Sequence, residues 1–263
     1  MKHNHSAIVF FSAFLLSFSS FLNAQTSFGE ARLINDGWLF RLKDEADAYK
    51  PDFNDKNWRK LNLPHDWSIE GTLSPTLASC TGYLPGGIAW YRKKLDITSD
   101  FNGKKVFIYF EGVYNRSSVY LNGQLLGSRP NGYVSFAYDL TPYLKYDTTN
   151  VLAVRVDHSQ YADSRWYTGS GIYRNVYLVT SYPIHFDLWG VTYQTKQVTN
   201  KEAVVQIVAN VKNETGVESD AKVLMQLMDL SGKIVARQFQ KKKLPAGVIS
   251  QFSSELTVKI PKL

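Results

Sequence analysis

The chain has 263 residues, of which 44% are hydrophobic and 20% are charged, and this composition excludes an intrinsically disordered protein. The net charge of +7 comes from scattered bases, and the longest basic run, Lys241-Lys242-Lys243, lies beside the turn residues Pro245-Ala246-Gly247. We interpret this run as a solvent-exposed hairpin turn and expect no nucleic-acid partner. The single Cys80 has no second cysteine or histidine cluster near it, which excludes an internal disulfide and predicts no metal site.

Residues 1–24 have the features of a secretory signal peptide. Lys2 provides a positive start, residues 7–21 form an apolar run dotted with serine, and Leu22-Asn23-Ala24 supplies a cleavage site before Gln25. The apolar run is shorter than the about 20 residues that a membrane-spanning helix needs. We therefore expect an exported protein, periplasmic or extracellular, with no membrane span.

Residues 25–182 are predicted to form one domain built from strands alone. Helical periodicity is almost absent, and short alternating apolar runs recur between Gly, Pro, Asn and Asp. Asn122-Gly123 is typical of a two-residue hairpin turn. We expect strands at residues 106–110, 118–121, 124–127, 151–156 and 176–179. Regular short strands of this kind favour a β-sandwich or jelly roll.

Residues 183–263 are predicted to form a second, immunoglobulin-like β-sandwich. We expect its strands at residues 187–193, 203–211, 221–230, 234–240 and 252–260, with turns at 213–216 and 229–232, the first of them a hairpin turn. An immunoglobulin-like sandwich has about seven strands, so we expect a truncated domain with unpaired strand edges and an uncovered apolar face. A self-sufficient five-strand module is the alternative.

Six sequence segments occur in a fixed order between residues 35 and 176. They are 35–40 (NDGWLF), 58–67 (WRKLNLPHDW), 87–93 (GIAWYRK), 110–113 (FEGV), 119–123 (VYLNG) and 164–176 (SRWYTGSGIYRNV). Each segment alone is weak evidence, but the ordered series is specific. It resembles the sugar-binding jelly-roll domain that opens family 2 glycoside hydrolases, and its PHDW and RWYTGSGIYR forms are most similar to the β-galactosidase branch.

This resemblance implies a retaining hydrolase that acts on terminal β-linked sugars, with carbohydrate as its partner. In the family, two glutamates on a (β/α)₈ barrel perform the reaction, and such a barrel takes about 250 residues. Residues 183–263 are too few for a barrel and are strand-like, and the Asn213-Glu214 pair lies in a turn. We therefore expect no catalytic residue and no cofactor in this chain, which would be inactive without a barrel in cis. The alternative is a stand-alone carbohydrate-binding or scaffold module without hydrolase activity.

Five residues are candidates for contact with the sugar. The resemblance implies that the loop before the Gly-Ile-Tyr-Arg turn helps to shape the pocket for the terminal sugar. Some family members have an acid at the position of Arg165, so a guanidinium there replaces a hydrogen-bond acceptor with a donor and leaves the identity of the sugar open. The candidates are His65, Asp66, Arg165, Trp166 and Tyr167.

Other residues in the motifs are interpreted as structural. We expect Trp38, Trp58 and Trp90 in the core, and the Glu111 carboxylate satisfied at a strand end. Gly169 and Gly171 indicate a bend with backbone conformations closed to other residues. Arg174 is expected to form a buried ion pair beneath this bend.

Overall fold

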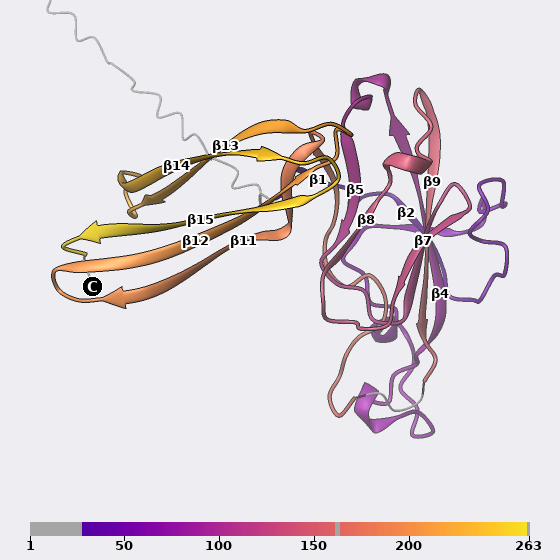
Figure 1. The fold of residues 1–263 in the computed structure, drawn as a ribbon. Helices are drawn as coiled ribbons and strands as arrows, with labels where there is room; N and C mark the ends of the chain where they lie inside the picture. Colours follow the sequence, from indigo (N-terminus) through magenta and orange to yellow (C-terminus); the bar gives the residue numbers. More distant parts are fainter. Residues whose placement is uncertain (1–27, 161–163, 262–263) are drawn as a thin grey trace, which may run out of the picture.

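The computed structural model describes residues 28–160 and 164–261, and in these ranges the regular structure is β-strands and short 3₁₀ turns. Figure 1 shows two sandwiches, with strands β11 to β15 projecting to one side of the first sandwich. The predicted all-β fold is confirmed. The expected signal peptide at residues 1–24 lies outside the described residues. In the part of the chain that is described, no helix has the length and hydropathy needed to cross a membrane.

The first domain is an antiparallel two-sheet sandwich of the jelly-roll kind. Its smaller sheet has the order β1 (Glu30–Leu33), β10 (Val176–Ser181), β5 (Lys105–Phe110) and β8 (Phe136–Asp139). Its larger sheet has the order β3 (Arg59–Leu61), β2 (Trp38–Arg41), β4 (Gly87–Ile97), β9 (Thr148–His158), β6 (Ser117–Leu121) and β7 (Gln124–Arg129). The predicted hairpin at Asn122-Gly123 joins β6 to β7, with Leu121 opposite Gln124.

The alternation of residues along the strands builds the core between these two sheets. On β5, Val106, Ile108 and Phe110 are fully buried, and the residues between them face outward. On the opposing sheet, Leu152 and Val154 of β9 are buried in the same cluster. A period of two residues therefore places one apolar face of each strand in a shared interior.

The outer face of the larger sheet is also covered. Because Ala89 and Tyr91 of β4 face the core, Trp90 and Arg92 point to the opposite side, where residues 42–58 between β2 and β3 lie. The three tryptophans predicted to be structural are all buried, Trp38 in the main core and the other two in this outer cluster.

The second domain packs a three-stranded sheet against a two-stranded one. The first sheet has the order β11 (Ile184–Val198), β12 (Glu202–Asn213) and β15 (Ile249–Lys259), and the second pairs β13 (Ser219–Met228) with β14 (Ile234–Leu244). All five expected strands are present. On β11, Val191 and Tyr193 are paired with Ala209 and Ile207 of β12, which belong to the core, so all four side chains lie on the inner face of the sheet. The Val191 side chain is nevertheless 42% exposed and that of Tyr193 is 79% exposed. Strands β13 and β14 therefore leave part of this face uncovered.

The turn at residues 213–216 was predicted as a hairpin turn, and this prediction is wrong. Strand β12 hydrogen-bonds to β11 and β15, whereas β13 pairs with β14, so the turn carries the chain from one sheet to the other. The buried Asn213 side chain donates to the carbonyl oxygens of Val217 and Leu244, both at 2.8 Å, and so ties the crossover to the end of β14. The run Lys241-Lys242-Lys243, also predicted as a hairpin turn, lies in strand β14, so this prediction is wrong too. The turn that follows at residues 245–247 joins β14 to β15 in the other sheet and is not a hairpin turn either.

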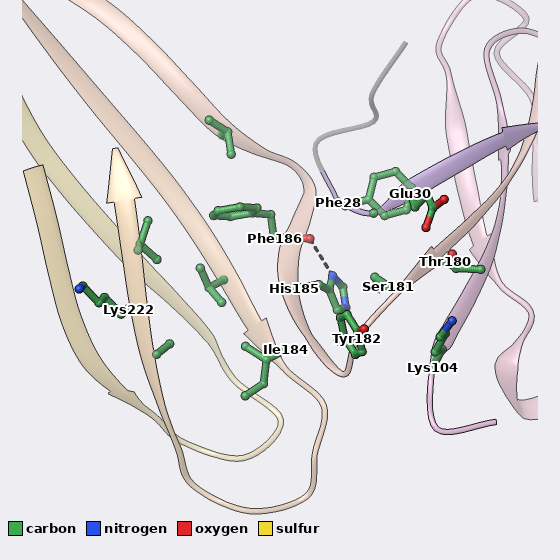
Figure 2. A pocket seen from close by; sticks show the side chains of 15 residues that line it. Phe28, Glu30, Lys104, Thr180, Ser181, Tyr182, Ile184, His185, Phe186 and Lys222 are labelled. Atoms are coloured by element: carbon green, nitrogen blue, oxygen red, sulfur yellow. Dashed lines mark hydrogen bonds between the residues drawn. The ribbon is translucent and has the colours of Figure 1, made fainter. Parts of the chain in front are cut away.

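The two domains meet where β10 ends at Ser181 and β11 begins at Ile184. A cavity of about 720 Å³ lies at this junction (Figure 2). Residues of the first domain such as Phe28, Lys104 and Thr180 line one side, and residues of the second such as Phe186 and Lys222 line the other.

Candidate functional site

Two loops of the jelly roll that are far apart in sequence are joined by backbone hydrogen bonds. The His65 amide donates to the Ile172 carbonyl at 2.9 Å, and the Trp67 amide donates to the Ser170 carbonyl at 3.0 Å. This pairing places the Pro-His-Asp-Trp motif directly beside the Arg-Trp-Tyr motif. All five candidate residues thus lie on two segments that only the tertiary fold brings together.

Asp66 is occupied by hydrogen bonds from its own protein. Its Oδ1 accepts the amides of Ser68 at 2.9 Å and Ser170 at 2.8 Å, and the Tyr167 hydroxyl donates to its Oδ2. Burial and the hydrogen bond to the Asp66 carboxylate raise the pKa of the Tyr167 hydroxyl, which therefore stays protonated at neutral pH. Asp66 holds Tyr167 and the loop around Ser170 in place, an arrangement typical of a positioning residue.

His65 lies beneath the site, in contact with core aromatic residues. Its side chain is 8% exposed, its ring lies edge-on to Phe40, and its Nδ1 is 2.7 Å from the Tyr91 hydroxyl. The ring Nε2 lies 2.9 Å from the Arg59 guanidinium, which can only donate, and 3.3 Å from the Glu70 carboxylate, which can only accept. Burial lowers the pKa of His65 even though the Glu70 carboxylate opposes this effect. A neutral, core-facing imidazole is typical of a structural role.

Trp166 is the most exposed of the aromatic candidates. The side chain is 60% exposed, and its indole Nε1 donates to the Tyr133 hydroxyl at 2.8 Å. Tyr133 is itself 47% exposed and Tyr167 is 43% exposed. We call Tyr133, Trp166 and Tyr167 the aromatic platform. Arg165, next to the platform in the chain, is also exposed.

Tyr133 was not among the predicted site residues. A single tyrosine after a glycine carries little signal in a sequence, although Gly132-Tyr133 follows the Val119–Gly123 motif in the family-like order. Its role depends on the hydrogen bond to Trp166, which lies 33 residues further along the chain. Only the fold brings these two residues into contact.

The platform rests on a rigid base. The Tyr133 ring packs edge-on against Tyr114, with ring centroids 5.3 Å apart, and the Tyr173 hydroxyl donates to the Gly132 carbonyl at 2.9 Å. A Cβ atom on Gly132 would lie 2.2 Å from the Tyr114 ring, so only glycine allows this packing. Ser164 donates to the Trp166 carbonyl at 2.7 Å. The exposed rings are therefore held before any ligand arrives, which lowers the entropic cost of binding.

The predicted glycine bend is confirmed. Gly169 and Gly171 have φ angles of +70° and +121°. A Cβ on Gly169 would lie 2.7 Å from Asp66 Oδ2, and a Cβ on Gly171 would lie 2.3 Å from the Tyr91 hydroxyl oxygen. The two glycines let the loop close onto the Pro-His-Asp-Trp segment.

The prediction of a buried ion pair at Arg174 is wrong. Arg174 is exposed, and its guanidinium lies over the Tyr173 ring, 5.6 Å from the centroid. The prediction assumed that Arg174 shares the face of buried Ile172, but residues 172–175 are not in a strand, so alternation does not apply. The Glu111 carboxylate accepts the Asn175 amide at 3.3 Å, as expected for a structural acid.

The side chains exposed at this site are able to form binding contacts. Within residues 28–160 and 164–261, no group of three or more His, Cys, Asp or Glu side chains is placed to hold a metal ion. The aromatic platform and Arg165 expose flat aromatic faces, phenolic hydroxyls and a guanidinium. Aromatic faces with a few polar groups beside them are suited to contact with the apolar faces and hydroxyls of a sugar ring.

Comparisons with known proteins agree with this description. Residues 31–183 match the family model described as glycosyl hydrolases family 2, sugar binding domain. The chain is 46% identical over 231 residues to the β-galactosidase BoGH2A of Bacteroides ovatus, covering 87% of the chain and 27% of that protein. It is 28% identical over 255 residues to a β-glucuronidase of Formosa agariphila, covering 87% of the chain and 26% of that protein.

Solved structures of the same family are also similar to this chain. The crystal structure of a glycosyl hydrolase family 2 member from Bacteroides cellulosilyticus superposes with a TM-score of 0.81 at 32% identity, covering 89% of this chain and 32% of that one. The chain spans about a quarter of the length of the curated relatives named above, 27% and 26%. It therefore belongs to glycoside hydrolase family 2 and corresponds to the N-terminal, sugar-binding portion of that family.

Proposed function

We propose that this chain is the non-catalytic N-terminal portion of a retaining glycoside hydrolase that acts on terminal β-linked sugars, with β-galactosides as the preferred substrates. The aromatic platform forms one wall of the sugar pocket in this proposal. The observation that carries it is Trp166, an indole that is 60% exposed and is held in one orientation by its hydrogen bond to Tyr133. The β-galactosidase name of BoGH2A supports the choice of sugar.

In this proposal the chain contributes to sugar binding, and another part of the polypeptide performs catalysis. Retaining hydrolysis needs two carboxyl groups about 5–5.5 Å apart, and we expect a catalytic barrel in the same polypeptide to supply them. The acids near the platform have other partners: Asp66 receives three internal hydrogen bonds, and Glu70 accepts from Arg59 at 2.7 Å. The chain would contribute shape, stacking surface and the Arg165 donor fork, and it needs no cofactor for that task.

Replacing Trp166 with alanine should weaken binding of a β-galactoside by about 30-fold or more, because a central aromatic anchor contributes about 2 kcal/mol or more. Calorimetric titration of the chain with lactose measures this loss. Tyr133→Phe keeps the ring but removes the hydrogen-bond acceptor of Trp166, so a smaller loss is expected. Parallel titrations with a β-glucuronide test whether Arg165 favours an acidic sugar.

Trp189 provides a matched control for this experiment. It is 53% exposed, but it lies on β11 in the second domain, so Trp189→Ala should leave binding unchanged. If both tryptophan variants bind as well as the unaltered chain does, the platform is not a sugar site.

A stand-alone carbohydrate-binding module is the second candidate. The platform is formed by residues 133 and 166–167 of the jelly roll, so binding would not require another domain. If this chain alone binds the sugar as tightly as a longer protein that also carries a barrel, the result would favour a stand-alone binding module.

Export to the periplasm or the extracellular space is part of the proposal and rests on the composition of residues 1–24. The exported product should begin at Gln25, because small Ala24 precedes it at the expected cleavage site. Mass spectrometry of the intact mature protein checks this. A product that retains Met1 would contradict export by this route.

A further inference from the structure

A surface loop beside the aromatic platform carries no charged side chain. Residues 71–91 contain no Asp, Glu, Lys, Arg or His, and this is the longest such run after residue 30. Residues 71–86, the first part of the run, join the Pro-His-Asp-Trp motif to β4 and lie at one end of the first sandwich (Figure 1). We call residues 71–86 the uncharged loop. Charged side chains make up 20% of the chain, so this loop is distinctly apolar for a surface segment.

Two large apolar side chains of the uncharged loop are exposed. Leu73 is 66% exposed and Tyr83 is 47% exposed. The Ser74 amide donates to the Tyr83 carbonyl at 3.0 Å, so the segments that carry these two side chains lie next to each other. A single exposed leucine is common on protein surfaces. A leucine and a tyrosine on adjacent segments of an uncharged loop form an apolar surface that a ligand can cover.

The uncharged loop is in contact with the aromatic platform. Gly82 lies against Tyr167, because a Cβ atom on this glycine would be 3.6 Å from Cδ2 of the Tyr167 ring. The Ser68 hydroxyl, just before the loop, donates to the Pro85 carbonyl at 2.7 Å and lies 2.5 Å from the Ser170 hydroxyl. These bonds connect the loop to the glycine bend that follows the platform. The apolar surface of the loop therefore continues that of the platform.

Tyr83 is held in a backbone conformation that is unfavourable for a bulky residue. Its φ angle is +60°, in the left-handed region. Its amide donates to the Ala78 carbonyl at 3.0 Å, and the hydroxyl of buried Thr81 lies 2.8 Å and 3.1 Å from the carbonyl oxygens of Ala78 and Leu84. The loop therefore fixes this conformation although the ring remains exposed. Strained residues of this kind cluster where proteins contact ligands.

We propose that Leu73 and Tyr83 form a subsite for the aglycone, the group attached to the anomeric carbon of the terminal sugar, and that this aglycone is an uncharged aromatic ring. The subsite rests on the proposed function, because the platform must hold the sugar for the neighbouring loop to reach the aglycone. A second sugar would need partners for its hydroxyls, whereas Leu73 offers none and Tyr83 offers a single hydroxyl. The flat face of an aromatic aglycone matches a leucine side chain and a tyrosine ring. The substrate class is thus an aryl β-glycoside.

The chain should bind phenyl β-galactoside about 10-fold more tightly than methyl β-galactoside, which has the same sugar and no aromatic ring. Calorimetric titration with the two glycosides measures this difference. Tyr83→Asn should remove most of it and leave the affinity for the methyl glycoside unchanged, because asparagine tolerates the left-handed conformation. Leu73→Ser should also reduce the difference, and its effect does not depend on the φ angle of Tyr83.

Tyr143→Asn is the matched control for these variants. Tyr143 is 41% exposed on the same domain, after β8 and outside the uncharged loop, so its replacement should leave the difference between the two glycosides unchanged. Equal affinities for the phenyl and methyl glycosides in the unaltered chain would overturn the inference. A difference that survives in both Tyr83→Asn and Leu73→Ser would overturn it as well.

Saturation-transfer NMR with phenyl β-galactoside separates the aglycone subsite from the proposed function. Irradiation of the chain should transfer saturation to the aromatic and the sugar protons of the ligand. Tyr83→Asn should reduce transfer to the aromatic protons, and Trp166→Ala should reduce transfer to the sugar protons. Saturation of the sugar protons alone would overturn the subsite and leave the proposed function in place, whereas saturation of the aromatic protons alone would support the subsite and contradict the sugar platform. A ligand that receives no saturation would overturn the subsite, since the loop and the platform both belong to this chain.

Discussion

Replacing Arg92 with alanine should lower the free energy of unfolding of the jelly-roll domain by about 3–5 kcal/mol, because the substitution breaks a buried ion pair and leaves its partner uncompensated. Arg92 is 2% exposed, and its Nε donates to Asp55 Oδ2 at 2.7 Å. Its guanidinium also donates to the carbonyls of Ala48, Lys50 and Pro51. One side chain thus satisfies four acceptors of the segment that covers the larger sheet.

Urea unfolding followed by tryptophan fluorescence measures this effect, since Trp58 at the end of this segment and Trp90 on β4 lie in one cluster. Lys94→Ala is the control, because Lys94 is on the same strand but exposed, and a change within about 0.5 kcal/mol is expected. Equal effects of Arg92→Ala and Lys94→Ala would show that the covering segment does not depend on the guanidinium.

Replacing Gly171 with alanine should lower the free energy of unfolding by about 2–6 kcal/mol. About 1–3 kcal/mol comes from holding alanine at a φ angle that L-residues rarely adopt. A further about 1–3 kcal/mol comes from overpacking, because the new Cβ would lie 2.3 Å from the Tyr91 hydroxyl oxygen and 2.8 Å from the His65 carbonyl oxygen. Urea unfolding of the variant and of the unaltered chain measures the total loss of unfolding free energy.

Gly103→Ala separates these two contributions. Gly103 has a φ of +77° in the same domain, but no atom lies within 4 Å of the position that the alanine methyl group would take, so only the backbone cost of about 1–2 kcal/mol is expected. Gly171→Ala should also weaken sugar binding, because Gly171 exchanges backbone hydrogen bonds with Tyr114, the residue beneath Tyr133. Similar destabilisation by both variants would contradict the steric argument.

The strands and the glycine bend were predictable from the sequence because their signals are local. Alternation along residues 106–110 depends only on the period of a strand, and Asn122-Gly123 has backbone preferences that specify a hairpin turn by themselves. Five alternating runs likewise predicted the five strands of the second domain. The ordered motifs were also sufficient to indicate the family, which the comparison over residues 31–183 confirms.

The pairing of strands across turns was not predictable in the same way. A turn sequence such as Asn213–Gly216 specifies that the chain reverses, but not whether the next strand joins the same sheet. That choice depends on which apolar faces can be buried together, and it involves residues distant in the sequence. The same crossover places Glu214 beside Lys105 of the other domain, a contact without any local signal.

The sequence by itself determined the all-β class, the succession of strands and the two segments that carry the candidate site. Only the tertiary structure decided what each candidate does: Asp66 and His65 are held by internal partners, whereas Trp166 is left exposed and gains Tyr133 as a neighbour. It also decided which arginine is buried, Arg92 and not Arg174. The physical reason is that residue type and spacing specify local conformation, whereas burial and hydrogen-bond partners depend on which distant segments the packed sheets bring together.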